Sequence, residues 1–105
     1  MNPRVFVTQE TRHNYSQAER YGEIVFCSWR EFSKHSQSKG NNDIIQGMNK
    51  IMEDFRSEED WILPSGSPIA IGLAFIIAAD KGSSIKILSW DNMVRQYHEV
   101  KLQLN

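Results

Sequence analysis

The sequence predicts an α/β sandwich of two or three layers, with a mixed, mostly parallel sheet of about five strands, two main helices and a C-terminal β-hairpin. Short β-branched or apolar runs alternate along the chain with two longer helical patterns. Strand–helix–strand units of this kind normally give parallel strands joined by crossover connections. The last segment alternates in the manner of a half-exposed strand, which predicts an antiparallel partner for the strand before it.

The whole chain sets limits on the class of protein. Its 105 residues suit one α/β domain over residues 1–105, and 40% apolar residues allow a real core. The net charge is −1, and no block of Lys and Arg stands out, so a dedicated nucleic-acid binder is disfavoured. A single cysteine, no visible secretory signal and no apolar run long enough for a bilayer indicate a soluble intracellular protein without a membrane partner.

The first two strands are expected near the N-terminus. Residues 4–8, "RVFVT", form a short β-type run, and residues 23–29, "EIVFCSW", are dense in β-branched and aromatic residues. Between them, Ser16 and Glu19 have the spacing of a capping box, and Gly22 is placed to end a single helical turn.

The first main helix is expected after a polar surface loop over residues 34–42. Asn42 or Asp43 is a suitable cap, and the helical pattern continues to about Arg56. Apolar residues recur at three- and four-residue steps and form one stripe, which predicts an amphipathic helix lying on the sheet. The stripe consists of Ile44, Ile45, Met48, Ile51, Met52 and Phe55.

The third strand and the second helix follow at once. Residues 60–63, "DWIL", are apolar enough for a central strand. Ser65 or Ser67 then caps a helix that has Pro68 in its first turn and Gly82 just past its end. This helix is apolar almost all round, so it is expected to be fully covered or to pack against another chain.

The C-terminal hairpin is expected to join residues 84–90 to residues 96–104 through a turn that begins at Asp91-Asn92. In the last strand, His98, Val100, Leu102 and Leu104 share one face, and the residues between them share the other. Its outer edge is a place where a second copy of the chain can pair, so a homodimer is one expectation.

The C-terminal half resembles a group of short bacteriophage-encoded proteins. The resemblance rests on an Asp-aromatic-aliphatic strand, a Gly-Asp/Ser-Pro helix start, an Ala/Gly-rich helix, and a Trp-Asp and Tyr hairpin. The matching residues are Asp60, Trp61, Gly66, Ser67, Pro68, Gly72, Ala74, Ala78, Trp90, Asp91, Tyr97 and Val100. It implies a phage protein acting in the host cytoplasm, and it carries no established activity. Ser67 stands where an acidic residue is common in the group.

The candidate binding residues follow from the rule that ligands of open α/β sheets bind beyond the carboxyl ends of parallel strands. They are Arg12, His13, Ser65, Gly66, Ser67, Trp90 and Asp91, with Gln9 and Glu10 beside them. Arg12 and the helix start would attract an anion, and Trp90 would stack on a base or ring. The simpler interpretation, which we favour, is that Ser67, Pro68 and Gly66 only start the helix, while Trp90 and Asp91 are a packing anchor and a turn.

Catalytic and metal chemistry have little support. Cys27 lies inside an apolar strand, where thiols are usually inert, and one cysteine with three unpaired histidines gives no zinc pattern. The glycine-rich loops that bind nucleotide phosphates are absent. The sequence therefore predicts no catalytic residue, no metal and no cofactor.

Three functions remain open. The first is a non-enzymatic phage accessory protein that binds a host or viral macromolecule as a regulator or inhibitor, in a host–virus interaction. The alternative is a protein or enzyme that binds a nucleotide or another small anion at Gly66 and Ser67 with Arg12. The third, weaker one is nucleic-acid association around Trp90 and Tyr97.

Overall fold

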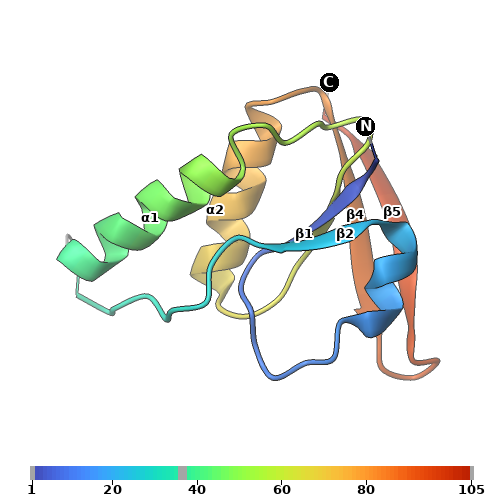
Figure 1. Ribbon diagram of the computed structural model, residues 1–105, viewed down its shortest axis with the longest axis horizontal. Coiled ribbons are helices and arrows are strands. Elements are labelled where there is room, and N and C mark those ends of the chain that lie inside the picture. Colours follow the sequence, from blue (N-terminus) through green and yellow to red (C-terminus); the bar gives the residue numbers. More distant parts are fainter. Residues whose placement is uncertain (1, 36–37, 105) are drawn as a thin grey trace.

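The computed structural model describes residues 2–35 and 38–104 (Figure 1). No helix within these two ranges is long and apolar enough to cross a membrane. Along the chain the elements are β1 (Arg4–Val7), the 3-10 helix η1 (Ser16–Tyr21), β2 (Glu23–Phe26), α1 (Lys39–Ile51), β3 (Trp61–Leu63), α2 (Pro68–Ala79), β4 (Ser84–Asp91) and β5 (Gln96–Gln103).

The strands form one sheet in the order β2-β1-β3-β4-β5. The pairs β1–β2, β1–β3 and β3–β4 are parallel, and β4–β5 is an antiparallel hairpin. The predicted fold class, a mixed and mostly parallel sheet with two main helices, is therefore confirmed. In the sheet, β2 lies on one side of β1. The connection after β2 passes β1, so that β3 lies on the other side of β1. This reversal is a topological switch point between β1 and β3.

Each face of the sheet has its own core. Figure 1 shows α1 and α2 on one side and η1 on the other. The helix side is centred on Phe6, Ile62 and Ile85 of the sheet, together with Met48 and Ala74 of the helices. On the η1 side the buried cluster contains Val5, Val7, Tyr15, Ala18, Trp61, Leu63, Leu88 and Tyr97. Both faces of β1 and β3 are covered, which explains their nearly continuous apolar sequence.

The boundaries of α1 differ from the prediction. The helix begins at Lys39 because the Ser38 hydroxyl accepts a hydrogen bond from the Asn41 amide at 3.0 Å, so Asn42 and Asp43 lie inside it. Residues 36–37 of the loop expected over 34–42 lie outside the described residues. The helix ends at Ile51 instead of Arg56. Met52 and Phe55 are nevertheless buried, since a series of turns continues the apolar pattern beyond the helix.

For η1 and α2, two of the predicted helix ends are wrong and two are confirmed. Ser16 does not cap η1, because Tyr15 occupies the capping position without a side-chain hydrogen bond, whereas Gly22 does follow its last residue. For α2, Ser67 is the cap and Pro68 the first residue. Its C-terminal cap is Asp80, so Gly82 lies beyond the end and does not cap it.

The amino ends of the strands are joined by Asp60, which directly precedes β3 and is fully buried. Its carboxylate accepts hydrogen bonds from the Arg4 amide at 3.0 Å and the Arg56 amide at 2.8 Å. The guanidinium groups of Arg56 and Arg4 approach it to 2.9 Å and 3.2 Å. Burial alone would raise the pKa of Asp60, but the hydrogen bonds from Arg56 and Arg4 outweigh it and hold the pKa below its usual value.

Candidate functional site

A crevice of about 480 Å³ opens at the switch point, beyond the carboxyl ends of β1 and β3. We call it the switch-point crevice. The loop after β1 contributes residues 9–12, the loop after β2 contributes Trp29, Glu31 and Phe32, and the start of α2 contributes Gly66 and Ser67. The structure thus brings together Arg12, Gly66 and Ser67 of the predicted binding residues.

Gln9 joins the three loops that form the crevice. Its side-chain oxygen accepts a hydrogen bond from the Ser67 amide at 2.6 Å, and its side-chain nitrogen donates to the Arg30 carbonyl at 3.1 Å. Gly66 has a φ of +86°, and a β-carbon on it would lie 2.6 Å from Cβ of Gln9. Glycine is therefore needed at this position both for backbone conformation and for space.

Beneath the crevice, β1 and β3 continue into a reciprocal pair of hydrogen bonds. The Thr8 hydroxyl donates to the Ser65 carbonyl at 2.6 Å and accepts from the Ser65 amide at 2.8 Å. The Ser65 hydroxyl lies 2.8 Å from the Tyr15 hydroxyl. Ser65 is therefore part of the supporting network, and its polar groups are used by the fold itself.

The start of α2 offers little to an anion. The Ser67 amide is bonded to Gln9, Pro68 has no N–H, and the Ile69 amide donates to the Ser67 hydroxyl at 3.1 Å. The charged residues lining the crevice are Glu10, Arg12 and Glu31, which sum to −1. Helix termini attract anions through unused N–H groups and positive charge, and here the protein itself bonds two of the first donors.

His13 and Trp90 lie in a separate aromatic cluster on the η1 face. The ring centroid of His13 is 5.2 Å from that of Trp90 and 5.1 Å from that of Tyr15. Trp90 also meets Tyr97, with 4.8 Å between the centroids, and its indole N–H donates to the Asn92 side chain at 2.7 Å. These edge-to-face contacts use the Trp90 ring in packing, as the simpler interpretation of the sequence expects.

Asp91 is the last residue of β4, where the hairpin turn begins, and it does not line the crevice. Its carboxylate accepts from the Met93 amide at 2.8 Å and lies 2.8 Å from the His98 ring nitrogen. The hydrogen bond with His98 and those from the backbone hold the pKa of Asp91 below its usual value. The predicted set of binding residues is thus divided among the crevice, the aromatic cluster and this turn.

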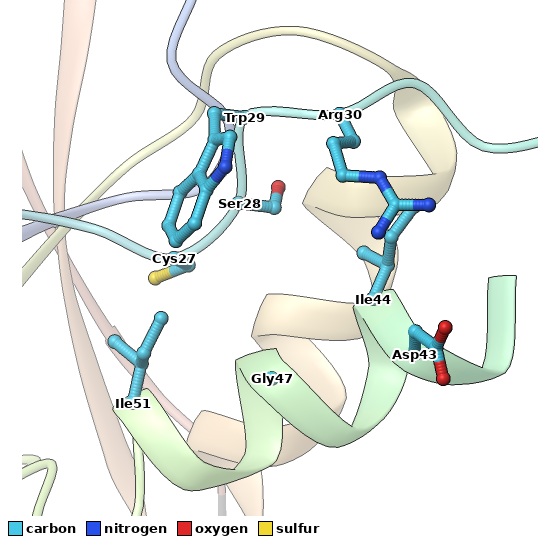
Figure 2. Close-up of a pocket in the computed structure, with 8 residues that line it drawn as sticks. All are labelled: Cys27, Ser28, Trp29, Arg30, Asp43, Ile44, Gly47 and Ile51. Atoms are coloured by element: carbon cyan, nitrogen blue, oxygen red, sulfur yellow. The ribbon is translucent and has the colours of Figure 1, made fainter. Parts of the chain in front are cut away.

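A second, smaller hollow lies between the loop after β2 and α1 (Figure 2). It measures about 90 Å³, and we call it the Trp29 hollow. Residues 27–30 line one side, and Asp43, Ile44, Gly47 and Ile51 of α1 line the other. Figure 2 shows Arg30 and Asp43 at one end, with Cys27, Ile51 and the Trp29 ring toward the other.

Trp29 is an exposed residue that was not among the predicted binding residues. The prediction placed it in a strand over residues 23–29, but β2 ends at Phe26. As a result, the Trp29 side chain is 62% exposed, and it lines both the switch-point crevice and the Trp29 hollow. The only sequence feature that could have indicated its exposure is that the charged residues Arg30 and Glu31 follow it directly.

Cys27 and metal chemistry can be assessed from the same geometry. Cys27 is buried, and burial raises the pKa of its thiol to about 12, which keeps the thiol protonated at neutral pH. Within residues 2–35 and 38–104, His, Cys, Asp and Glu side chains do not form any group of three or more that could hold a metal ion.

Comparison with known proteins gives one family match. A family model described as phage Pam3 gp32-like protein matches residues 3–104, which is nearly the whole chain. The match therefore extends over the N-terminal half, well beyond the segment on which the resemblance to phage proteins rests. No curated protein and no solved structure matches the chain.

Proposed function

The chain belongs to the phage Pam3 gp32-like family, and we propose that it is an accessory protein of a bacteriophage that works in the host cytoplasm as a non-enzymatic binding module. In this proposal its target is a host or viral protein, which it regulates or inhibits. The observation that carries the proposal is the exposed Trp29 side chain standing between two hollows.

An exposed tryptophan in this setting has the properties of a binding anchor. Trp and Arg are over-represented among the few residues that dominate protein–protein binding energy. Here Trp29 is followed directly by the exposed Arg30, and both line the Trp29 hollow. The Gln9 hydrogen bond to the Arg30 carbonyl fixes the backbone beneath them. A backbone that is already held in place loses less conformational freedom on binding, which favours affinity.

The Trp29 hollow is suited to one aliphatic side chain of a protein partner. Its volume of about 90 Å³ is smaller than the roughly 150 Å³ of an apolar cavity that holds benzene. Cys27, Ile44 and Ile51 supply apolar walls, while Arg30 and Asp43 supply polar groups at one end. An inserted side chain would cover Trp29, and the two charged residues would face polar groups of the partner.

The proposal that the protein is not an enzyme is supported by its thiol and by the hydroxyl groups near the crevice, which are not activated as nucleophiles. The only thiol of the chain is buried and protonated, so it is a poor nucleophile. The hydroxyl groups of Thr8 and Ser65 serve the backbone and Tyr15 at the base of the crevice. These groups stabilise the fold, and none is paired with a histidine base in the manner of a serine or cysteine nucleophile.

The test is capture of proteins from host lysate by tagged wild type and by Trp29→Ala, with quantitative mass spectrometry. We expect a specific protein to be lost from the variant, since removing a hot-spot residue costs about 2 kcal/mol or more in binding. Met93→Ala is the matched control, because Met93 is 93% exposed in the hairpin turn and should leave capture unchanged. Equal retention by wild type and Trp29→Ala would contradict the proposal.

A second candidate is a nucleotide or other small anion, bound or chemically converted at the switch-point crevice near Gly66, Ser67 and Arg12. The position of the crevice favours it, since open α/β sheets bind ligands at such points. It is the second candidate because the amides of Ser67 and Ile69 are already hydrogen-bonded, and because Glu10 and Glu31 would repel an anion. Thermal shift against phosphate and a nucleotide panel tests it, with Arg12→Ala expected to remove any stabilisation. No shift with any compound would reject it.

A further inference from the structure

β5 is an edge strand with an open side. It is the last strand in the sheet order, and it pairs regularly with β4 over eight residue pairs, from Ser84↔Gln103 to Asp91↔Gln96 (Figure 1). Natural proteins protect open edges with short strands, prolines, bulges or charged side chains, especially Lys. The charges of β5 are Glu99 and Lys101, and they oppose pairing only in registers that bring like charges together. β5 is eight residues long, has no proline and keeps an uninterrupted register with β4.

The backbone groups on this open side belong to alternate residues. The Leu104 amide donates to the Ser83 carbonyl at 2.7 Å, which continues the register of the hairpin. Since hydrogen bonding alternates along an antiparallel strand, the even-numbered residues of β5 bond to β4. The N–H and C=O groups of Tyr97, Glu99, Lys101 and Gln103 therefore point to the open edge.

Two of these edge residues carry charges that have no ion-pair partner among residues 2–35 and 38–104. Lys101 lies opposite Lys86 in the hairpin, and the Lys86 ammonium sits 4.1 Å from the centre of the Trp61 ring. Glu99 lies opposite the buried Leu88. Both Glu99 and Lys101 are exposed, and neither forms a salt bridge with any residue of the described ranges. Like charges directly opposite each other destabilise a sheet, so Lys101 would gain from a carboxylate on its other side.

We propose that two copies of this chain pair their β5 edges antiparallel about a twofold axis at Val100, which joins the two sheets into one. This register places Glu99 of each copy directly opposite Lys101 of the other, and Tyr97 opposite Gln103. All four residues are those whose backbone groups face the open edge. The two new ion pairs supply the carboxylate that Lys101 lacks among the described residues of its own chain.

Charge also selects this register over its neighbours. Moving the axis by one residue in one direction would place Glu99 opposite Glu99, and in the other direction Lys101 opposite Lys101. Opposite-charge pairs across strands stabilise and like pairs destabilise, so only the axis at Val100 avoids repulsion among these three registers. The interface contains neither Trp29 nor the crevice, so it stands or falls independently of the proposed binding function.

Sedimentation velocity over a concentration series tests the ion pairs. We expect a dimer for wild type and at least a tenfold weaker dimer for Glu99→Lys and for Lys101→Glu, because each change creates two repulsive pairs. Mixing the two variants should restore dimers, since each copy then offers the opposite charges at both positions. Wild type that stays monomeric throughout, or variants that fail to recover on mixing, would overturn the proposal.

A cross-linking experiment tests the register separately. At the proposed axis, Val100 of one copy lies opposite Val100 of the other copy in a non-hydrogen-bonded pair. The Cα atoms of such a pair are about 4.5 Å apart, a distance at which a disulfide fits. Val100→Cys should therefore form a covalent dimer on mild oxidation, while the buried Cys27 stays unreactive. Leu102→Cys is the matched control, because it would face His98 of the other copy. Cross-linking of Leu102→Cys but not of Val100→Cys would overturn the register.

Discussion

The two ends of the parallel strands are held together by different chemistry. At the amino ends, the buried carboxylate of Asp60 is surrounded by the amides and guanidinium groups of Arg4 and Arg56. At the carboxyl ends, neutral groups make the connections, with Thr8 bonded to Ser65 and Gln9 bonded to Ser67. One end depends on an ionised group, and the other depends on hydrogen bonds without charge.

The difference accounts for the position of the switch-point crevice at the carboxyl ends of β1 and β3. A buried carboxylate must be fully paired to remain charged, so the long arginine side chains fold over Asp60 and cover it. Neutral groups at the other end reach the backbone over short distances and leave room between the loops. The charged end should therefore dominate stability, and the neutral end should tolerate change and accept a partner.

The largest effect is expected from Asp60→Asn. The change keeps the shape of the side chain but removes the charge that the two arginines neutralise, and it presents an amide N–H₂ to their donors. Breaking a buried ion pair by changing one partner costs about 3–5 kcal/mol. We expect a loss of that size in the free energy of unfolding, measured by urea denaturation at neutral pH.

Asp54→Asn is the matched control for this change. Asp54 pairs with the same Arg4 at 3.1 Å, but its side chain is 66% exposed, so the loss should be below about 1 kcal/mol. Acid provides a second check. Because the folded-state pKa of Asp60 is lowered, its contribution is present at neutral pH and is lost as pH falls through that pKa. The free energies of unfolding of wild type and Asp60→Asn should therefore converge in acid. If their difference stays constant with pH, the charge of Asp60 is not the cause of the stability loss.

A smaller effect, of about 1–3 kcal/mol, is expected from Gly66→Ala at the neutral end. The residue has a φ of +86°, which costs energy for any residue with a β-carbon. The new methyl group would also displace the Gln9 side chain and disturb its bond to the Ser67 amide. Thermal and urea unfolding should both show the loss, together with higher mobility of the crevice loops in hydrogen exchange.

Gly72→Ala should stabilise the protein if backbone geometry is the reason why Gly66→Ala destabilises it. Gly72 lies within α2, and a β-carbon there would meet no atom within 4 Å. Replacing a glycine inside a helix by alanine stabilises by roughly 0.5–1 kcal/mol. Equal destabilisation by both substitutions would mean that the crevice end has no special dependence on Gly66, and the contrast between the two ends would be weaker.

Much of the fold could be predicted from the sequence because local patterns carry it. Apolar runs located the strands, the spacing of Ile44, Met48 and Ile51 located α1, and Ser67 with Pro68 located the start of α2. The class of the sheet and the antiparallel hairpin follow from the order of the elements. Errors occurred where a side chain bonds to the backbone nearby, as with Ser38, since several Ser and Asn residues there were suitable caps.

The site was less predictable because it depends on contacts between distant residues. The rule that ligands bind beyond the carboxyl ends correctly grouped Arg12 with Gly66 and Ser67, but it also included Trp90 and Asp91. Those two belong to β4, which is separated from the β1–β3 switch point by its place in the sheet order. Local sequence does not encode that order, nor the early end of β2 that exposes Trp29.

A smaller loss than that of Gly66→Ala is expected from Ser67→Ala, which removes the cap of α2 but leaves the Gln9 bond to its backbone amide. Loss of a serine cap costs about 1 kcal/mol, and Ser38→Ala should cost a similar amount because its hydroxyl caps α1 by accepting from the Asn41 amide. Ser67→Asp sharpens the test, since aspartate caps as well as serine and favours the positive helix start. If Ser67→Asp is as stable as wild type in urea, capping explains why serine and an acid both suit this position. If it is as unstable as Ser67→Ala, the neighbouring Glu10 and Glu31 make the neutral end intolerant of charge, and the contrast with Asp60 becomes sharper.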